Sequence, residues 1–316
     1  MLTPVALIIF NRPDTTERVF EEIRRARPPK LLVVADGPRA DMPGEAERCT
    51  AARAIIDGVD WDCEVLTNYS DVNLGCKLRP TTGLDWVFDT VPEAIIFEDD
   101  CLPDPTFFRF CDELLEKYRD DSRVAMISGN NFQYGRRRTP YSYYFSRYTH
   151  TWGWASWSRA WRNFDATIGQ WPEIRDGGWL EDILGCPGPA RYWTDIFERV
   201  YMGELVDVWD YQWLLACWAQ GALTVLPNVN LISNIGFDER ATHTIGKSRF
   251  SDMPTEPVHF PLSHPPFIVR DGLADGHTEA EMFSGTVPSA PSRMFALLKR
   301  LLRHGRPGIE TKRRSK

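Results

Sequence analysis

The sequence predicts an α/β protein with a doubly wound, mainly parallel sheet and helices on both faces. Strand-length apolar runs alternate with amphipathic helical segments over the first ~130 residues, which is the pattern of strands joined by crossover helices. The runs are apolar throughout, as is typical of strands covered on both faces. With 316 residues, of which 43% are hydrophobic and 26% charged, the chain is long enough to bury a substantial core.

The predicted elements follow one another along the first half of the chain. The segment 12–27 places its apolar residues on one stripe and carries Pro13 in its first turn, which predicts a helix between two strands. Strands are expected at 5–10, 31–35, 63–66, 94–97 and 124–128, and further helices near 46–56, 80–88 and 105–118. The last of these helices has the clearest start, because Asp104 can cap it and Pro105 suits its first position.

After Gly129 the alternation stops and the composition changes. Ten of the twelve tryptophans lie between Trp152 and Trp218. Helices are expected near 192–202 and 209–219 and a strand at 223–226, whereas 250–291, with seven prolines, is expected to be loop or linker. The chain is therefore divided into 1–131, 132–250, 251–291 and a basic tail at 292–316.

Charge and composition exclude several classes of protein. The net charge of −7 argues against nucleic acid as a broad partner. No apolar run approaches the roughly 18 residues of a membrane span, and the first residues lack the basic region and cleavage site of a signal peptide. The seven cysteines are scattered without CxxC spacing, which suits a reducing compartment. We therefore expect a cytoplasmic protein.

The charge is unevenly distributed along the chain. Residues 292–316 hold nine Lys or Arg and one acid, Glu310, whereas 1–291 hold 28 basic and 43 acidic residues. Within this tail, 294–302 is apolar on one side and basic on the other. The pattern predicts reversible contact with the inner face of a membrane; a solvated tail is the alternative.

The most informative polar feature is an acidic cluster, Glu98, Asp99 and Asp100, directly after the apolar run at 94–97. Three carboxylates at the end of a strand repel one another unless a cation or a donor-rich ligand lies among them. Oxygen ligands of this kind suit Mn²⁺ or Mg²⁺, usually shared with phosphate oxygens. The alternative is that the acids only cap the following helix. The sequence contains no GxxxxGK[ST] or GxGxxG motif, so neither a P-loop nor a dinucleotide fingerprint is predicted.

Polar residues also follow the other predicted strand ends of the first half. They are Asn11, Arg12, Asp36 and Gly37 after the first two strands, and Lys77 and Arg79 in a glycine-containing loop. An aspartate can bind a ribose hydroxyl, and lysine or arginine can neutralise a diphosphate. Each residue has a simpler interpretation as a turn or a surface charge. Together with the acidic cluster, at one edge of one sheet, they predict a nucleotide-diphosphate site.

The second half offers an aromatic wall. Trp152 and Trp154 flank Gly153, and sugar rings lie with their CH faces against indoles while the indole N–H can bond a hydroxyl. We therefore expect these two tryptophans to bind an acceptor. The alternative for any tryptophan is the core, which we expect for Trp157 and Trp161.

Two further polar residues are candidates. Asp210 lies in the run Trp-Asp-Tyr-Gln-Trp, where a carboxylate among large rings can act as general base for a hydroxyl nucleophile or only cap the following helix. His243 lies in a polar loop after the last predicted strand. It can contact phosphate or a metal, or form hydrogen bonds alone.

Taken in order, these segments resemble glycosyltransferases of the GT-A fold, in particular the inverting N-acetylglucosaminyltransferase I-like group and its soluble bacterial relatives. The most specific stretch is IIFEDDCLPDPTFF at 95–108, similar to that family's strand, acidic triad and helix start. Residues 124–131, Trp-Gly-Trp at 152–154 and Trp-Asp at 209–210 follow in the family's order. The resemblance runs from residue 5 to about 243.

The resemblance implies a GT-A, Rossmann-like fold with a Trp-rich acceptor side. It implies that Asp100 binds Mn²⁺ and through it the donor diphosphate, that Glu98 and Asp99 hold the donor's sugar and nucleoside, and that Asp36 holds the base or ribose. The family's base is the second Asp of a Trp-Asp-Asp-Trp motif; this chain has Trp-Asp-Tyr-Gln-Trp, so the base would be Asp210. Residues 1–131 would then bind the nucleotide sugar, and 132–250 the acceptor.

We therefore expect a metal-dependent inverting glycosyltransferase that moves a sugar from a nucleoside-diphosphate sugar, with a UDP-sugar favoured, to a hydroxyl of a glycan or lipid-linked acceptor. Asp210 would deprotonate that hydroxyl, while the metal on Asp100, with Lys77 or Arg79, stabilises the departing diphosphate. Two alternatives stay open. A sugar-phosphate nucleotidyltransferase uses a similar sheet and metal, although residues 10–13 lack its glycine-rich loop. A non-catalytic carbohydrate-binding protein would use the tryptophans without needing the acidic cluster.

Overall fold

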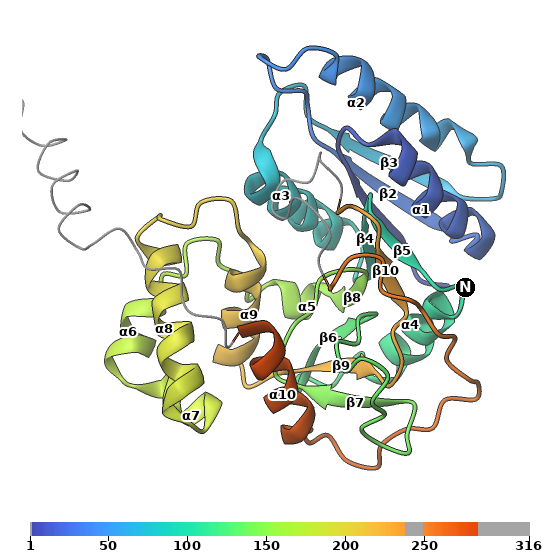
Figure 1. Ribbon diagram of the computed structural model, residues 1–316. Coiled ribbons are helices and arrows are strands. Elements are labelled where there is room, and N and C mark those ends of the chain that lie inside the picture. The colour runs from blue at the N-terminus through green and yellow to red at the C-terminus, as the bar shows by residue number, and fades with distance from the viewer. Residues whose placement is uncertain (1, 238–248, 284–316) are drawn as a thin grey trace, which may run out of the picture.

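A computed structural model describes residues 2–237 and 249–283. Its centre is an eight-stranded sheet in the order β3-β2-β1-β4-β8-β6-β9-β7 (Figure 1). The strands are β1 (Val5–Ile9), β2 (Lys30–Ala35), β3 (Glu64–Tyr69), β4 (Glu93–Glu98), β6 (Val124–Ser128), β7 (Tyr143–Ser146), β8 (Trp154–Trp157) and β9 (Leu223–Pro227). Strands β3, β2, β1 and β4 are parallel, β8 is antiparallel to β4 and β6, and β7 is antiparallel to β9. The predicted mixed, mainly parallel sheet is confirmed.

Helices cover both faces of this sheet, as predicted (Figure 1). Because side chains alternate along a strand, Val5 and Leu7 of β1 pack with α1, α2 and α4, whereas Ala6 and Ile8 pack with α3, α5 and α9. The helices are α1 (Pro13–Ala26), α2 (Glu45–Ala54), α3 (Gly75–Thr90), α4 (Thr106–Lys117), α5 (Ser158–Trp161), α6 (Trp171–Asp176), α7 (Trp179–Leu184), α8 (Pro187–Tyr201), α9 (Asp210–Ala219) and α10 (Gly272–Thr278).

Helices α6, α7 and α8 form what we call the helical module, beside the sheet (Figure 1). The module has its own apolar core, to which α9 contributes Leu215 and Trp218. From its other side α9 contributes Trp213 and Cys217 to the core beneath the sheet. Helix α9 is therefore held by two cores at once.

Three helices start at other residues than the sequence predicts, and one of them, α8, begins at Pro187 rather than near residue 192. Helix α3 begins at Gly75 rather than near residue 80, because the carboxylate of Asp36, at the end of β2, accepts the backbone N–H groups of Leu74 (2.8 Å) and Gly75 (2.9 Å). A cap supplied from another strand leaves no local signal. At α4, Oδ1 of Asp104 accepts the N–H of Thr106 at 2.9 Å as expected, although the helix begins at Thr106.

Part of the segment expected to be loop is helical. Helix α10 is capped by Asp271, whose side chain accepts the N–H groups of Leu273 and Ala274, and a π-turn (Glu279–Phe283) continues it. The fully buried carboxylate of Asp275 accepts hydrogen bonds from Ser146 (2.6 Å) and Arg147 (3.2 Å). Long-range partners of this kind, rather than periodicity, hold the segment on the sheet.

No helix within residues 2–237 and 249–283 has the length and apolar character needed to cross a membrane. The basic tail at 292–316 and His243 lie outside the described residues.

His150 gives a prediction about stability. It is 5% exposed, and its Nε2 has no hydrogen-bond partner among the described residues; burial lowers its pKa from 6.5 to about 3. As pH falls below 6.5, His150 becomes protonated in the unfolded chain but stays neutral in the folded protein. The free energy of unfolding therefore falls by about 1.4 kcal/mol per pH unit. Urea unfolding at pH 6.5 and 4.5 should show about 2–3 kcal/mol less acid destabilisation in His150→Gln. Equal pH dependence in both proteins would contradict this.

Candidate active site

A cleft of about 990 Å³ opens at the carboxyl ends of β1, β2 and β4 and reaches the start of α9. Parallel strands commonly place their ligand sites at this edge. The structure brings many of the predicted residues to the cleft, namely Asn11, Arg12, Asp36, Arg79, Glu98, Asp99, Asp100, Trp152 and Asp210. Gly37, Lys77 and Trp154 do not line it.

The acidic cluster forms one wall of the cleft. Glu98 ends β4, and Asp99 and Asp100 form the turn into the short strand β5 (Cys101–Pro103). Nη2 of Arg12 lies 2.5 Å from Oδ1 of Asp99 and 2.9 Å from Oδ2 of Asp100. The N–H of Phe10 donates to Oδ2 of Asp99 at 3.1 Å. Both oxygens of Asp99 are thus engaged within the protein, and Asp99 orients Arg12.

Electrostatics at this wall favour a positively charged ligand. Burial, followed by the charges of Asp100 and Asp99, raises the pKa of Glu98 to about 8, and Asp210 adds to the effect. Burial also raises the pKa of Asp99 to about 6 despite the opposing charge of Arg12. Ionising the whole cluster is therefore costly unless a positive charge beyond that of Arg12 lies beside it.

The donor set fits a divalent cation only in part. Carboxylate oxygens are the ligands that Mg²⁺ and Mn²⁺ prefer, and such an ion would stabilise the ionised forms of these acids. Within the described part of the chain, however, no three acidic, histidine or cysteine side chains converge to hold a metal. A cation here would be held by one or two of these carboxylates and completed by water and ligand oxygens, as is usual for Mg²⁺. The predicted second ligand, His243, lies outside the described residues.

The backbone of residues 232–236 covers the acidic cluster. Strand β10 (Ile232–Asn234) pairs with β5, and the chain then passes so close that a Cβ at Gly236 would lie 2.0 Å from Oδ2 of Asp100 and 2.6 Å from Nη1 of Arg12. The N–H of Ile235 donates to the carbonyl of Asp100 at 2.9 Å. A side chain at position 236 would therefore displace the ends of the Asp100 and Arg12 side chains.

Arg79 provides a buried positive charge. It is 5% exposed, and its Nη2 donates to the carbonyl (2.7 Å) and Oδ1 (2.8 Å) of Asn68 on β3. Its Nε has no hydrogen-bond partner, and no carboxylate of the described residues forms an ion pair with it. Burial lowers its pKa. A buried guanidinium in this state favours an anionic ligand.

Two further arginines were missed by sequence reasoning. Arg39 and Arg48 line the cleft, and both lie near Glu45, a fully buried carboxylate in the first turn of α2. Oε1 of Glu45 accepts Nδ2 of Asn11 at 2.8 Å, and Oε2 accepts the N–H of Arg39 at 2.7 Å. Neither arginine follows a strand directly. The sequence signal that could have indicated them is the position of Glu45, at the start of a helix and between the two arginines in the chain.

The contacts of Asp36 and Gly37 are structural. Oδ1 of Asp36 accepts the backbone N–H groups of Gly37 (2.9 Å) and Leu74. Its Oδ2 accepts the side-chain Nδ2 of Asn73 (3.0 Å) and the backbone N–H of Gly75. The carboxylate is therefore saturated by the start of α3. A Cβ at Gly37 would lie 2.5 Å from the backbone of a neighbouring loop, so this glycine permits close packing beneath the cleft.

The prediction that Trp154 forms a binding wall is wrong. It is 1% exposed, and its ring packs 6.1 Å from Trp209 and 5.9 Å from Trp213. The alternation of β8 turns it toward α9 and into the core on that face of the sheet. Trp161 lies in the same core and Trp157 in the core on the other face, so both are buried as expected.

Trp152 and Asp210 border the cleft together. Trp152 is partly exposed and meets Phe237 edge to face at 5.7 Å. Asp210 is the first residue of α9 and faces the cleft after the buried Trp209. It acts electrostatically on Glu98, so the two carboxylates belong to one charged site. The arrangement can hold a cation or deprotonate a hydroxyl group.

Fold and site together define an α/β protein with a cleft large enough for a nucleotide-sized ligand. No protein-family model matches the chain, and no curated protein matches it. Among solved structures, the chain is similar to 4-diphosphocytidyl-2C-methyl-D-erythritol synthase from Anaerococcus prevotii, with 10% identity and a TM-score of 0.36 over 71% of this chain and 86% of that one. It is also similar to mouse xyloside xylosyltransferase 1 (11%, TM-score 0.34, 68% and 81%) and a cytidylyltransferase from Leptospira borgpetersenii (11%, 0.32, 57% and 70%). Likeness at this level carries no argument about function, which rests on the site's own residues.

Proposed function

We propose that the protein is an inverting glycosyltransferase that moves a sugar from a nucleoside-diphosphate sugar, with a UDP-sugar favoured, to a hydroxyl of a glycan or lipid-linked acceptor. The observation that carries the proposal is the distribution of charge in the cleft. The carboxylates of Glu98, Asp100 and Asp210 gather at the end of β4, whereas the buried Arg79 is bonded to β3. A ligand with phosphates between a sugar and a nucleoside matches both features.

The spacing of the two charged regions suits such a ligand. Strands β4 and β3 are three positions apart in the sheet, which corresponds to about 14 Å at the usual inter-strand distance. Arg39 and Arg48 border the cleft near the start of α2. We assign the nucleoside to the side of β2 and β3, and the sugar to the side of β4 and α9.

Asp100 and Glu98 would hold a Mn²⁺ or Mg²⁺ ion, which when bound supplies positive charge against the departing diphosphate. Arg12 is held beside them by Asp99 and stabilises phosphate oxygens in the same region. Arg79 contributes a second guanidinium from a buried position, where its charge is weakly screened.

Asp210 takes the proton from the acceptor hydroxyl in the proposed reaction. The oxygen attacks the anomeric carbon on the face opposite the diphosphate, the bond from that carbon to the phosphate oxygen breaks, and the electron pair leaves with the diphosphate. A single displacement of this kind inverts the anomeric configuration. Trp152, beside Phe237, forms the apolar wall for the acceptor.

The proposal is tested by calorimetry and turnover with UDP-, GDP- and dTDP-sugars in the presence and absence of Mn²⁺. Arg79→Met should weaken UDP binding about 10- to 100-fold, because a charged hydrogen bond at a buried site is lost. Lys77→Met is the matched control, since Lys77 lies on the same helix but does not line the cleft. Equal weakening in both variants would contradict the assignment.

The same experiment separates the rival functions. Pyrophosphate released from a sugar phosphate and a nucleoside triphosphate would show a nucleotidyltransferase instead. Binding of free sugars without any binding of nucleotides would show a carbohydrate-binding protein.

We also propose peripheral contact of the basic tail, residues 292–316, with the cytoplasmic face of a membrane. Vesicles containing about 30% anionic lipid should bind the full-length protein several-fold more strongly than neutral vesicles, since each basic residue near such a surface contributes up to ~1 kcal/mol. Replacing Arg293, Lys299, Arg300 and Arg303 by serine should reduce the difference strongly in a sedimentation assay, because it removes four of the nine basic residues of the tail. Unchanged binding by this variant would remove the proposal.

A further inference from the structure

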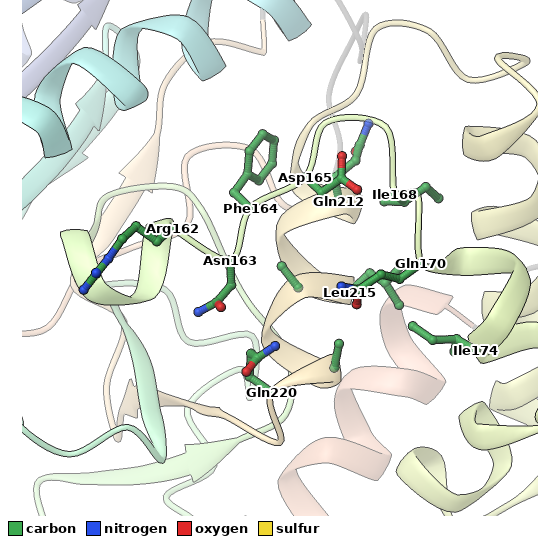
Figure 2. A pocket seen from close by; sticks show the side chains of 12 residues that line it. Arg162, Asn163, Phe164, Asp165, Ile168, Gln170, Ile174, Gln212, Leu215 and Gln220 are labelled. Carbon is green, nitrogen blue, oxygen red and sulfur yellow. The ribbon is translucent and has the colours of Figure 1, made fainter.

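A second cavity, of about 270 Å³, lies between α9 and the loop 162–170. Figure 2 shows the loop running alongside the helix, with Gln212 and Asp165 near one end and Gln220 near the other. No residue lines both this cavity and the cleft. The function proposed above does not use it.

Gln212 lines the cavity with an unsatisfied polar atom. Its side chain is 1% exposed, and its Nε2 donates to the carbonyl of Val208 at 2.8 Å, which fixes the orientation of the amide. Its Oε1 is buried and has no hydrogen-bond partner in the part of the chain that the structure describes. A buried carbonyl oxygen without a donor is costly, and a hydroxyl group in the cavity would satisfy it.

Apart from Arg162, whose exposed side chain points away from α9 (Figure 2), the remaining lining indicates a neutral ligand. Asn163, Gln170 and Gln220 add amide groups, which donate and accept hydrogen bonds without carrying charge. The carboxylate of Asp165 also borders the cavity, but its Oδ1 accepts the N–H of Thr167 at 2.8 Å and its Oδ2 that of Gly169 at 2.7 Å. This acid is therefore engaged in its own loop.

The volume of the cavity and its apolar surface further restrict the class of ligand that it can hold. Leu215 and Ala216 of α9, with Phe164 of the loop, provide apolar surface beside the amides. The volume lies just below the roughly 300–1,000 Å³ of pockets for drug-sized ligands, so the cavity suits one small ring rather than a nucleotide. Amides next to an aromatic and aliphatic surface match a ring with hydroxyl groups on its edge and CH groups on its faces.

We propose that this cavity binds a single neutral sugar ring, with Gln212 Oε1 accepting a hydroxyl and the amides of Gln170 and Gln220 completing its recognition. Gln212 lies two residues after Asp210 on α9, so it faces the side of the helix opposite the acidic cluster. The proposal does not depend on the transferase activity.

The test is saturation-transfer NMR with D-glucose, D-galactose, D-mannose and N-acetyl-D-glucosamine, each titrated to about 100 mM, on the full-length protein with UDP and Mn²⁺ present throughout. At least one sugar should bind saturably. Gln212→Leu should weaken that binding about tenfold or more through the loss of one buried hydrogen bond, and Ala216→Leu should block it by filling the cavity.

Gln170→Ala and Gln220→Ala serve as second variants, because both side chains are exposed and leave the Gln212–Val208 contact intact. Each should weaken binding several-fold without changing the thermal unfolding midpoint. The absence of saturable binding by all four sugars, or equal binding by the wild type and all four variants, would overturn the proposal. If the wild-type protein bound a sugar at this site but did not bind UDP, the proposed transferase function would be contradicted, whereas the sugar site would not.

Discussion

Replacing Asp210 by asparagine should lower kcat for sugar transfer by about 10²–10⁴-fold, the usual contribution of a positioned general base. Asparagine keeps the size and the place of the side chain at the start of α9 but cannot accept the proton of the acceptor hydroxyl. Because Asp210 does not contact the diphosphate in the proposed reaction, the dissociation constant for UDP should stay within about threefold. Initial rates with saturating donor and acceptor, together with calorimetry of UDP, check both parts.

Asp207→Asn is the matched control for this experiment. Asp207 lines the same cleft three residues earlier but is exposed, and its backbone carbonyl accepts the thiol of Cys76 at 3.4 Å. Its substitution should leave kcat within about twofold, as is usual for exposed surface positions. If Asp207→Asn matched the loss in Asp210→Asn, or if Asp210→Asn kept near-full transfer, the base would have to be another residue.

Replacing Asp100 by asparagine should remove Mn²⁺-dependent donor binding and lower kcat/KM by about 10³-fold or more. The variant lacks the carboxylate that would hold the cation and one of the two charged partners of Arg12 Nη2. Titration of Mn²⁺ in the presence of UDP measures the first effect, and initial rates measure the second. Asp104→Asn is the control, because Asp104 caps α4 outside the cleft. Full metal-dependent binding by Asp100→Asn would exclude the assigned role.

The raised pKa of Glu98 gives this prediction a pH dependence. With a folded-state pKa of about 8, Glu98 is mostly protonated at pH 7, and a cation that uses its carboxylate must displace that proton. The affinity for Mn²⁺ should therefore rise about fivefold from pH 7 to pH 8 and level off about one pH unit higher, at roughly ten times its value at pH 7. Glu98→Gln should remove this rise. An unchanged pH profile in the variant would show that Glu98 does not hold the ion.

The sequence predicted the position of those cleft residues that directly follow a strand. The acidic cluster directly follows an apolar run. The end of that strand therefore also gave the position of the cluster in the fold, at the carboxyl edge of the sheet. Arg79 was recognised as a cation, but its burial depends on Asn68 in β3, a contact that no local pattern shows.

The residues that were misplaced are those whose direction depends on tertiary packing. Trp152 and Trp154 are two residues apart and looked equivalent in sequence, yet one borders the cleft and the other is enclosed by α9. Lys77 and Arg79 share the first turns of α3, but the helix turns only Arg79 into the cleft. Arg39 and Arg48 reach the cleft because Glu45 is buried near both, which depends on how α2 meets β1.

Helix α9 is buried on two sides, by the core beneath the sheet and by the core of the helical module. Opening the middle of this helix would disturb both cores, so its central amide groups should exchange with water more slowly than those of helices packed on one side. A helix of this kind does not adapt its first residue to different substrates. In the proposed transferase, changes in acceptor preference should therefore arise in the loops around Trp152 and Phe237 rather than at Asp210.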